Sequence, residues 1–158
     1  AKTIQDSLDG FGHVLVAHDR GLLVGTLRVN FLRDGDIGEY TTLYGLDDIS
    51  EGQRISTSIT TRLMISKPYR SGTLAVKLSK AVFEFALSNG IDSDFIDCNP
   101  PLDAFFTKLG HKRVRAIVHP EYGSVVVMKL DLRDHAHLRS IGSPFARSIV
   151  KPNFIKGN

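Results

Sequence analysis

The order of hydrophobic patterns along the chain predicts an α/β fold: a mixed, strongly twisted sheet with crossover helices. Residues 13–31 and 112–132 each contain two strand-like runs around a short turn, which is typical of a β-hairpin. Between the hairpins, a strand pattern at 56–66 precedes an amphipathic helix at 74–88, and another strand pattern follows at 93–98. A helix between two such strands joins parallel neighbours, so we expect both strand directions in one sheet.

Length and composition favour one globular domain. The chain has 158 residues, of which 42% are hydrophobic and 23% charged, enough for one core but not for two comfortable domains. We therefore expect a single domain at 1–150 and a loose C-terminal tail at 151–158. The chain has a single cysteine, Cys98, which excludes an internal disulfide. We expect Cys98 to be buried as a small apolar residue and not to carry the acyl group covalently.

Charge and hydropathy indicate the kind of partner. The formal net charge is +3 and the isoelectric point is about 9.1, which favours an anionic partner but is too weak to indicate nucleic acid. No apolar run approaches the length of a membrane span, and no signal peptide heads the chain. These features predict a cytoplasmic protein with no integral membrane association and no nucleic-acid partner.

The elements of the N-terminal half follow from turn and strand signals. A short polar helix is expected within residues 1–12, ahead of the first hairpin. Arg28 lies in the middle of the second strand of that hairpin, where an arginine needs a partner or water. Loops are expected at 33–38 and 47–54, with a helical turn at 39–46 between them.

A basic turn separates the central strand from the long helix. Lys67-Pro68-Tyr69-Arg70-Ser71-Gly72 breaks the strand pattern after Ser66. A helix N-terminus carries unpaired N–H groups and a partial positive charge, to which Lys67 and Arg70 add full charges. These groups predict an anion site suited to a phosphate or pyrophosphate. The alternative is an ordinary strand-to-helix turn with solvated basic residues.

The C-terminal half adds a second helix and the final hairpin. Asn99-Pro100-Pro101 opens the expected helix at 102–109, with proline in its first turn. The hairpin consists of strands at 112–119 and 123–132, and a basic segment at 135–148 follows it.

No metal site is expected. Asp92, Asp94 and Asp97 alternate with apolar residues but lack the glycine and glutamate of a calcium loop, so we interpret them as strand-edge residues. His135 and His137 are two residues apart and do not share a helical face.

Two motifs resemble the GNAT superfamily of N-acyltransferases. Arg70-Ser71-Gly72-Thr73-Leu74-Ala75 is similar to the acyl-donor motif Arg/Gln-x-x-Gly-x-Gly/Ala; both ends match, and Thr73 replaces the usual central glycine. The segment 99–112, with Phe105 and Phe106 ahead of Lys-Leu-Gly, resembles the second motif. The order and spacing of the two motifs imply a GNAT-like mixed, strongly twisted sheet with crossover helices.

Further segments resemble the branch that contains acyl-homoserine lactone synthases and long-chain N-acyl amino acid synthases. They are Asp6-Ser7-Leu8-Asp9, Gly25-Thr26-Leu27-Arg28, Thr61-Arg62-Leu63 and the tail segment 137–145. Ile59 stands where homoserine lactone synthases carry a glutamate, three residues before the strand arginine. This difference favours the amino acid synthase group.

The resemblance implies a thioester donor and no tightly bound cofactor. The co-substrate is expected to be an acyl carrier protein with its phosphopantetheine, or acyl-CoA. Its phosphates would lie on the basic turn, and its pantetheine would run along the strand that ends near Ser66, like an added strand. The expected donor-binding residues are Met64, Ile65, Lys67, Arg70, Ser71, Gly72, Thr73, Leu74 and Asn99.

Acyl transfer to an amine requires a base and a stabilised carbonyl oxygen. Glu39 is the expected base, directly or through water, and a solvated surface glutamate is the alternative. A backbone N–H between Arg62 and Ile65 is expected to polarise the carbonyl. Phe106 stands where many superfamily members have a tyrosine that protonates the leaving thiolate.

Arg28 and Arg62 are the other expected catalytic residues. Arginine inside a strand is unfavourable unless it binds something. The two side chains are expected to hold an acceptor carboxylate, or to fix the fold by pairing with Asp6, Asp9 or Glu39.

Together these features predict transfer of a fatty acyl chain from a carrier-protein or CoA thioester to the amine of an amino acid or similar small amine, by direct attack on the thioester. Residues numerous enough to line an acyl channel are Phe31, Leu43, Tyr44, Phe105, Phe106 and Phe145. The alternatives are an acetyl-CoA-dependent acetyltransferase and a non-catalytic module that senses acyl thioesters.

Overall fold

The computed structural model describes residues 6–149, which contain a six-stranded sheet in the order β1-β2-β3-β4-β6-β5. The strands are β1 His13–Asp19, β2 Leu22–Phe31, β3 Thr57–Ile65, β4 Ser93–Cys98, β5 Lys112–His119 and β6 Gly123–Asp131. The α-helices are α1 Tyr40–Leu43, α2 Glu51–Ile55, α3 Leu74–Ser88, α4 Asp103–Leu109 and α5 His135–Ser140. Neighbouring strands are antiparallel except β3 and β4, which are parallel and joined through α3. The predicted fold class is confirmed.

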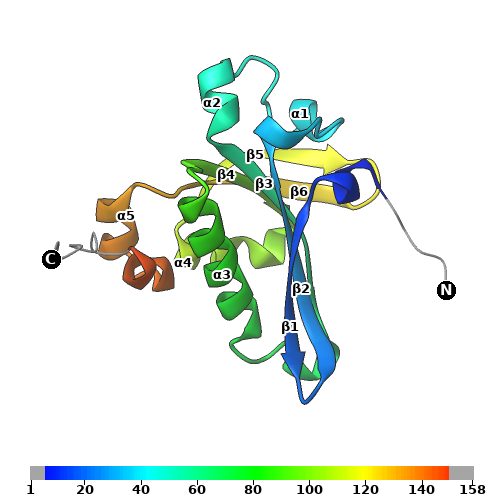
Figure 1. Ribbon diagram of the computed structural model, residues 1–158, viewed down its shortest axis with the longest axis vertical. Coiled ribbons are helices and arrows are strands. Elements are labelled where there is room, and N and C mark those ends of the chain that lie inside the picture. The colour runs from blue at the N-terminus through cyan, green and yellow to red at the C-terminus, as the bar shows by residue number, and fades with distance from the viewer. Residues whose placement is uncertain (1–5, 150–158) are drawn as a thin grey trace, which may run out of the picture.

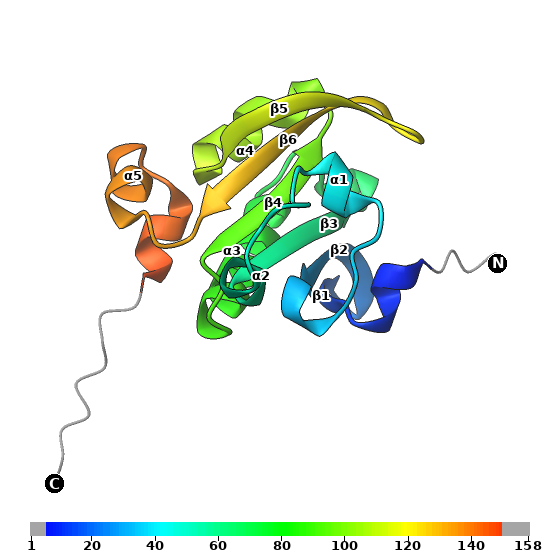
Figure 2. The ribbon, with the colours of Figure 1, turned by 90° about the horizontal axis from the view of Figure 1, so that it is seen from above.

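The sheet is strongly twisted. In Figure 1 the β1–β2 hairpin runs down the view, whereas the β5–β6 hairpin runs across it. Figure 2, from above, shows β5 and β6 arching away from the plane of β1 and β2. The parallel pair β3 and β4 therefore joins two differently oriented halves of the sheet, at the point where a crossover helix begins.

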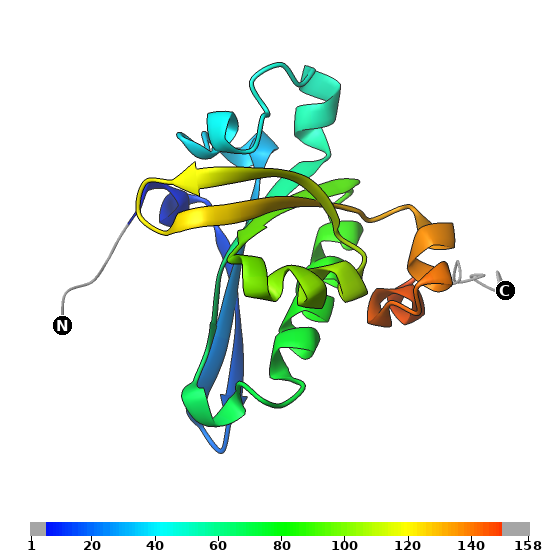
Figure 3. The ribbon, with the colours of Figure 1, turned by 180° about the vertical axis from the view of Figure 1, so that it is seen from behind.

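Apolar side chains cover both faces of the sheet. On one face, α3 buries Leu78, Val82 and Ala86, spaced four residues apart, in the larger of two apolar clusters. Figure 3 shows α3 and α4 together on this side of the sheet. The smaller cluster, on the opposite face, includes Tyr44 and Phe95. Burial of each large side chain contributes about 1.5–3 kcal/mol to folding, so both faces stabilise the central strands.

The basic segment after β6 packs against the core. Leu138 of α5 and Phe145 of the following 3₁₀ segment, Pro144–Ser148, are buried. The ring of Phe145 stacks on that of Phe83 with centroids 4.6 Å apart. This segment therefore closes the α3 side of the core. The predicted tail at 151–158 lies outside the described residues.

Some local expectations are wrong. The expected loop at 47–54 contains the start of α2, because Ser50 and Gln53 form a capping box that satisfies backbone N–H groups at the helix start. Asp94 is not a strand-edge residue, since it pairs with Ser58 of β3 on one side and with Leu130 of β6 on the other.

The expected N-terminal helix at 1–12 is described only from residue 6 onward, because residues 1–5 lie outside the described part of the chain. Between residues 6 and 12 it consists of the 3₁₀ segment Ser7–Gly10. No helix of the described part of the chain has the length and apolar character needed to cross a bilayer.

Candidate active site

The sheet opens between its two parallel strands. β3 and β4 pair only from Thr57 to Ile59, opposite Ser93 to Phe95, and are unpaired with each other beyond this point. A mainly apolar cavity of about 70 Å³ lies at the opening. Its walls come from β3, β4, α3, α4 and the C-terminal segment, and they include Arg62, Leu63, Ser79, Asp94, Ile96, Asp97, Phe106, His111 and Phe145.

A bulge lies in β3 at this opening. The register with β2 shifts between Thr26 and Arg28, so that Arg62 and Leu63 both face Leu27. Arg62 adopts a φ of 56°, a left-handed conformation that is uncommon outside glycine. Because the stretch has no β4 neighbour, its backbone groups face an unpaired strand edge.

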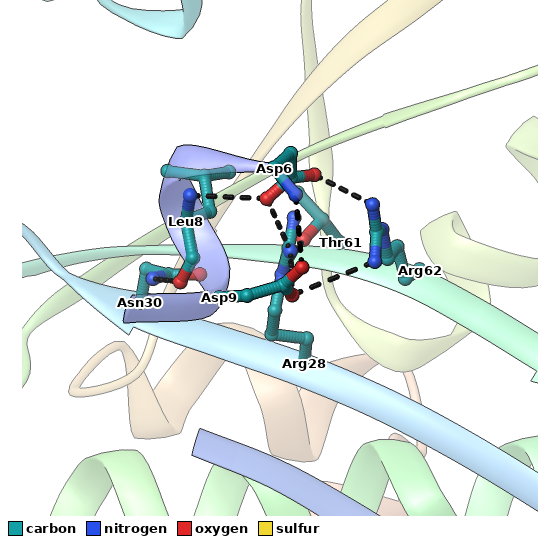
Figure 4. A network of polar contacts seen from close by, with 7 residues as sticks. All are labelled: Asp6, Leu8, Asp9, Arg28, Asn30, Thr61 and Arg62. Atoms are coloured by element: carbon teal, nitrogen blue, oxygen red, sulfur yellow. Dashed lines mark hydrogen bonds and ion pairs between the residues drawn. The ribbon is translucent and has the colours of Figure 1, made fainter. Parts of the chain in front are cut away.

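Two arginines meet two carboxylates beside the bulge (Figure 4). Nη1 of Arg28 donates to Oδ1 of Asp6 at 2.8 Å and to Oδ1 of Asp9 at 2.7 Å. Nη2 of Arg62 donates to Oδ2 of Asp6 at 2.7 Å, and its Nη1 lies 3.5 Å from Oδ1 of Asp9. Nε of Arg28 donates to the Thr61 hydroxyl at 3.0 Å. The ion pairs with Asp6 and Asp9 that the sequence suggested are therefore present.

The network is buried on one side and accessible on the other. The Arg28 side chain is 2% exposed, whereas that of Arg62 is 34% exposed. Asp6 and Asp9 form a capping box, and the hydrogen bond from the Asp6 backbone, followed by that from Arg28, lowers the pKa of Asp9. Nη2 of Arg28 is buried and has no hydrogen-bond partner within residues 6–149. This nitrogen is therefore a hydrogen-bond donor to which neither Asp6 nor Asp9 binds.

The basic turn connects the end of β3 to α3. A 3₁₀ segment, Lys67–Tyr69, follows the strand, and α3 begins after Thr73 without a side-chain cap. Nε of Arg70 donates to the Ile65 carbonyl at 2.9 Å, and the Tyr69 hydroxyl donates to Asp19 at 2.5 Å, which ties the turn to β1. Within the described residues, neither Lys67 nor Arg70 forms an ion pair. These charges and the first N–H groups of α3 remain available to an anion.

Two buried titratable groups line the cavity. Asp94 accepts hydrogen bonds from the Ser58 hydroxyl at 2.6 Å and the Thr60 hydroxyl at 2.9 Å, yet burial raises its pKa to about 7. Burial lowers the pKa of His111 to about 4, and its Nδ1 lies 3.2 Å from the Phe106 carbonyl. The cavity therefore favours the uncharged forms of both groups.

A further carboxylate lies at the opening and was not among the predicted catalytic residues. Asp97 is half-buried on β4, and its Oδ2 accepts a hydrogen bond from the Tyr44 hydroxyl at 2.7 Å. Tyr44 is 2% exposed, and burial, followed by the charge of Asp97, raises its pKa well above the usual value. Tyrosine rings in the segment 39–46 and aspartates in 92–97 were visible in the sequence, but nothing there indicated their contact.

The remaining predicted residues are more dispersed. Glu39 is the N-cap residue of α1, and its exposed side chain makes no capping hydrogen bond and no ion pair within residues 6–149. Asn99 is exposed at the end of β4. The structure thus brings Arg28 and Arg62 together and leaves Glu39 at the surface, and its role as a base stays a prediction.

Cys98 is buried, as predicted. Its Sγ lies 3.8 Å from the Met128 sulfur, and burial is the main cause that raises the pKa of its thiol. Phe106 is buried on α4 with its ring edge-on to that of His111. In the described part of the chain, no group of three or more His, Cys, Asp or Glu side chains is arranged to hold a metal ion.

A mixed sheet that opens between two parallel strands, directly ahead of a basic helix N-terminus, is the arrangement of GNAT-fold N-acyltransferases, and this chain is an N-acyltransferase of that fold. The model of the family described as N-acyl amino acid synthase FeeM matches residues 5–131. The chain therefore belongs to the FeeM family of N-acyl amino acid synthases. No curated protein sequence matches it.

Solved structures share the fold. FeeM, an N-acyl amino acid synthase from uncultured soil microbes, has 18% sequence identity and a TM-score of 0.68, covering 84% of this chain and 82% of its own. The CoA-dependent acyl-homoserine lactone synthase BjaI, with SAM and isopentyl-CoA, has 19% identity and a TM-score of 0.67, covering 89% and 69%. An aminoglycoside 6'-N-acetyltransferase complexed with coenzyme A has 14% identity and a TM-score of 0.56, covering 77% and 73%.

Proposed function

We propose that this N-acyltransferase moves a long-chain acyl group from an acyl carrier protein or CoA thioester to the amine of an amino acid or similar small amine. The observation that carries the proposal is the opening between β3 and β4, which has a basic turn at one end and two arginines at its side. The family match supports amino acid acylation, and the CoA ligands named for BjaI and the aminoglycoside acetyltransferase support a thioester donor.

The donor is proposed to bind along the free edge of β3. Its phosphates contact the basic turn and the start of α3, through Lys67, Arg70 and the backbone of residues 71–74, where unpaired N–H groups favour an anion. The pantetheine then pairs with the backbone of Met64 and Ile65 as an added strand, and Asn99 faces it from the end of β4.

This pose sets the reacting carbonyl at the bulge. A backbone N–H between Arg62 and Ile65 polarises the carbonyl oxygen, an effect of about 3 kcal/mol where such a donor is preorganised. The acyl chain enters the apolar cavity lined by Leu63, Phe106 and Phe145. The enclosed volume, about 70 Å³, is small for a long chain, which makes a short acyl donor such as acetyl-CoA the second candidate.

Arg28 and Arg62 are proposed to bind an acceptor carboxylate. Arg62 is partly exposed, and Arg28 has a buried N–H group without a partner inside the described residues. A carboxylate at this position would add charge-assisted hydrogen bonds to a network that already holds both guanidinium groups in place. Glu39, the base expected from the sequence, is one candidate base on the acceptor side, at the N-cap of α1.

The decisive experiment is mass analysis of small-molecule products. The protein is incubated with carrier-protein and CoA thioesters of several chain lengths and with a pool of amino acids. A long-chain N-acyl amino acid supports the proposal, and the donor that yields it separates carrier protein from CoA. Product from acetyl-CoA alone supports the second candidate. Tight thioester binding without any product contradicts both and indicates a sensing module.

A further inference from the structure

We propose that Asp97, which lies outside the predicted donor and catalytic residues, binds the ammonium group of the acceptor and removes its proton, and that Tyr44 positions it. The inference rests on the proposed function and identifies the group that recognises and activates the acceptor amine. Glu39, the base expected from the sequence, becomes the competing candidate within the same experiment.

The position of Asp97 carries the first part of the argument. It follows closely after Phe95, the last β4 residue that pairs with β3. Ile96 and Cys98 are buried in the larger apolar cluster, so by strand alternation Asp97 shares the opposite face with Phe95. It nevertheless lines the same cavity as Arg62. The carboxylate therefore borders the opening on the β4 side, and the bulge borders it on the β3 side.

Tyr44 holds this carboxylate in one orientation. Its hydroxyl donates to Oδ2 of Asp97, and its ring is fixed between those of Tyr40 and Phe95, with centroid distances of 5.2 and 6.5 Å. Burial and then the charge of Asp97 also raise the pKa of Tyr40 to about 12, so Tyr40 lies within range of the same charge. Oδ1 of Asp97 has no hydrogen-bond partner among residues 6–149 and is not fully buried. That oxygen is the free acceptor.

The charges around the opening indicate that the ligand of Asp97 is a cation. Unlike Asp6 and Asp9, Asp97 forms no ion pair within the described chain. A half-buried carboxylate without a counter-charge is unfavourable until a cation binds. Arg62, on the other strand of the opening, carries a positive charge that is paired with Asp6 and Asp9, and its side chain is still 34% exposed. Opposite charges on the two strands of the opening match the zwitterion of an α-amino acid, whose carboxylate and ammonium groups are attached to one carbon.

The chemical step then balances with the groups present. The Asp97 carboxylate takes a proton from the acceptor ammonium, and the nitrogen lone pair attacks the thioester carbonyl carbon. The new C–N bond yields a tetrahedral oxyanion at the bulge, and the C–S bond breaks with its electron pair on sulfur. The second proton passes from nitrogen to the thiolate, and Asp97 returns its proton to solvent. The products are the amide and the free thiol.

The test compares Asp97→Asn with Glu39→Gln and Asp48→Asn. Asparagine keeps the shape and an oxygen that accepts from Tyr44, and Asp48 is an exposed control with no hydrogen bond or ion pair among residues 6–149. Melting curves establish that each variant is folded. We expect Asp97→Asn to lower kcat/KM for the amino acid by about 100-fold or more, with donor affinity unchanged. Asp48→Asn is expected to match the wild type. Glu39→Gln is the variant of the competing base, and we expect it to lower kcat/KM less than Asp97→Asn does.

Hydroxylamine separates base catalysis from a structural defect, because this nucleophile is already uncharged at neutral pH. Its acylation is expected to be nearly equal in the wild type and Asp97→Asn. Tyr44→Phe is expected to raise KM for the amino acid several-fold with a smaller change in kcat. If Asp97→Asn lost activity equally with the amino acid and with hydroxylamine, the inference would be overturned. Full activity of this variant with the amino acid would also overturn it.

The two proposals fail in different ways. An active wild type whose activity depends on Glu39 and not on Asp97 overturns the inference alone. If the wild type forms no N-acyl product, calorimetric titration of amino acids into the CoA-saturated protein still tests Asp97. Binding that Asp97→Asn abolishes supports its role in ammonium recognition, whereas binding that the substitution leaves unchanged, or no binding by the wild type, overturns it.

Discussion

Nη1 of Arg28 lies 2.7 Å from Oδ1 of Asp9, and this ion pair connects the buried middle of β2 to the 3₁₀ segment at the N-terminal side of the sheet. The same nitrogen also reaches Asp6 at 2.8 Å. A guanidinium that is 2% exposed depends on such partners, because an uncompensated buried charge is strongly destabilising. The N-terminal segment is therefore required to neutralise the strand arginine.

Replacing Asp9 by Asn tests this dependence. The variant keeps the side-chain shape but removes one of two charges that face Arg28, so we expect the free energy of unfolding to fall by about 1–3 kcal/mol. Urea unfolding at neutral pH measures it. Because the pKa of Asp9 is lowered in the folded state, its contribution is present at neutral pH and is lost as the pH falls through that pKa. Asp48→Asn, on the surface, is the control, and equal stability of the two variants would contradict the prediction.

The left-handed backbone of Arg62 gives a second prediction. Arg62→Gly and Arg62→Ala remove the same ion pairs, but alanine must adopt the φ of 56° that glycine tolerates. We expect the alanine variant to be less stable than the glycine variant by about 1 kcal/mol in urea unfolding.

Met64 supplies the matched control, because it is an exposed residue of the same strand with no positive φ. There glycine should be the less stable substitution, since it weakens a regular strand. The same order of stabilities at both positions would show that the bulge is not strained.

The fold was largely predictable from the sequence because its elements are periodic. Six strands and α3 follow from period-two and helical patterns, and the parallel pairing of β3 and β4 follows from the helix between them. By contrast, α2 is a single short, polar helix that depends on the contact of Ser50 with Gln53, and a loop-like composition concealed it.

The site was predictable where its residues follow motifs. The pairing of Arg28 and Arg62 with Asp6 and Asp9 was one of two expectations for these arginines, because an arginine inside a strand needs a partner. Contacts across the sheet were not. Tyr44 and Asp97 are separated by 53 positions and meet only because Tyr44, the C-cap residue of α1, packs against Phe95 of β4. Likewise, Asp94 was interpreted as a strand-edge residue, because alternation alone does not reveal that the Ser58 and Thr60 hydroxyls of β3 bind it.

Asp94 and His111 line one cavity and give opposite pH effects on stability. The pKa of Asp94 is raised to about 7, so its contribution to stability is present below its unfolded pKa and is lost as the pH rises through 7. The pKa of His111 is lowered to about 4, so its contribution is present above pH 6.5 and is lost as the pH falls through 4. Between about pH 4 and 6.5 the two effects oppose each other in the wild type.

Single substitutions are expected to uncover each effect. With Asp94→Asn, the free energy of unfolding should rise with pH between 4 and 6.5 by up to about 3 kcal/mol, because only His111 remains. With His111→Gln it should fall over the same range, because only Asp94 remains. Urea titrations at several pH values measure both slopes, with His18→Gln, at an exposed histidine of β1, as the control. If the free energy of unfolding changed with pH in the same direction in both variants, the opposite effects assigned to Asp94 and His111 would be wrong.

The basic turn yields the prediction that bears most directly on the donor. Arg70 is exposed, its Nε is held by the Ile65 carbonyl, and it forms no ion pair within residues 6–149. Arg70→Glu reverses a charge beside the start of α3, so we expect the Kd for CoA to rise by about tenfold or more, equivalent to about 1.4 kcal/mol. Calorimetric titration measures this at low salt. The difference from the wild type should shrink as salt screens the charge.

Arg139→Glu is the matched control, because Arg139 is an exposed arginine of α5 with the same change in net charge. A local phosphate contact predicts that Arg70→Glu weakens binding and Arg139→Glu does not. Equal weakening by both would instead reflect the overall charge of the protein, as in long-range steering. Unchanged CoA affinity in both variants would show that the donor phosphates do not bind at the turn between β3 and α3. The proposed position of the thioester along the free edge of β3 would then also be wrong.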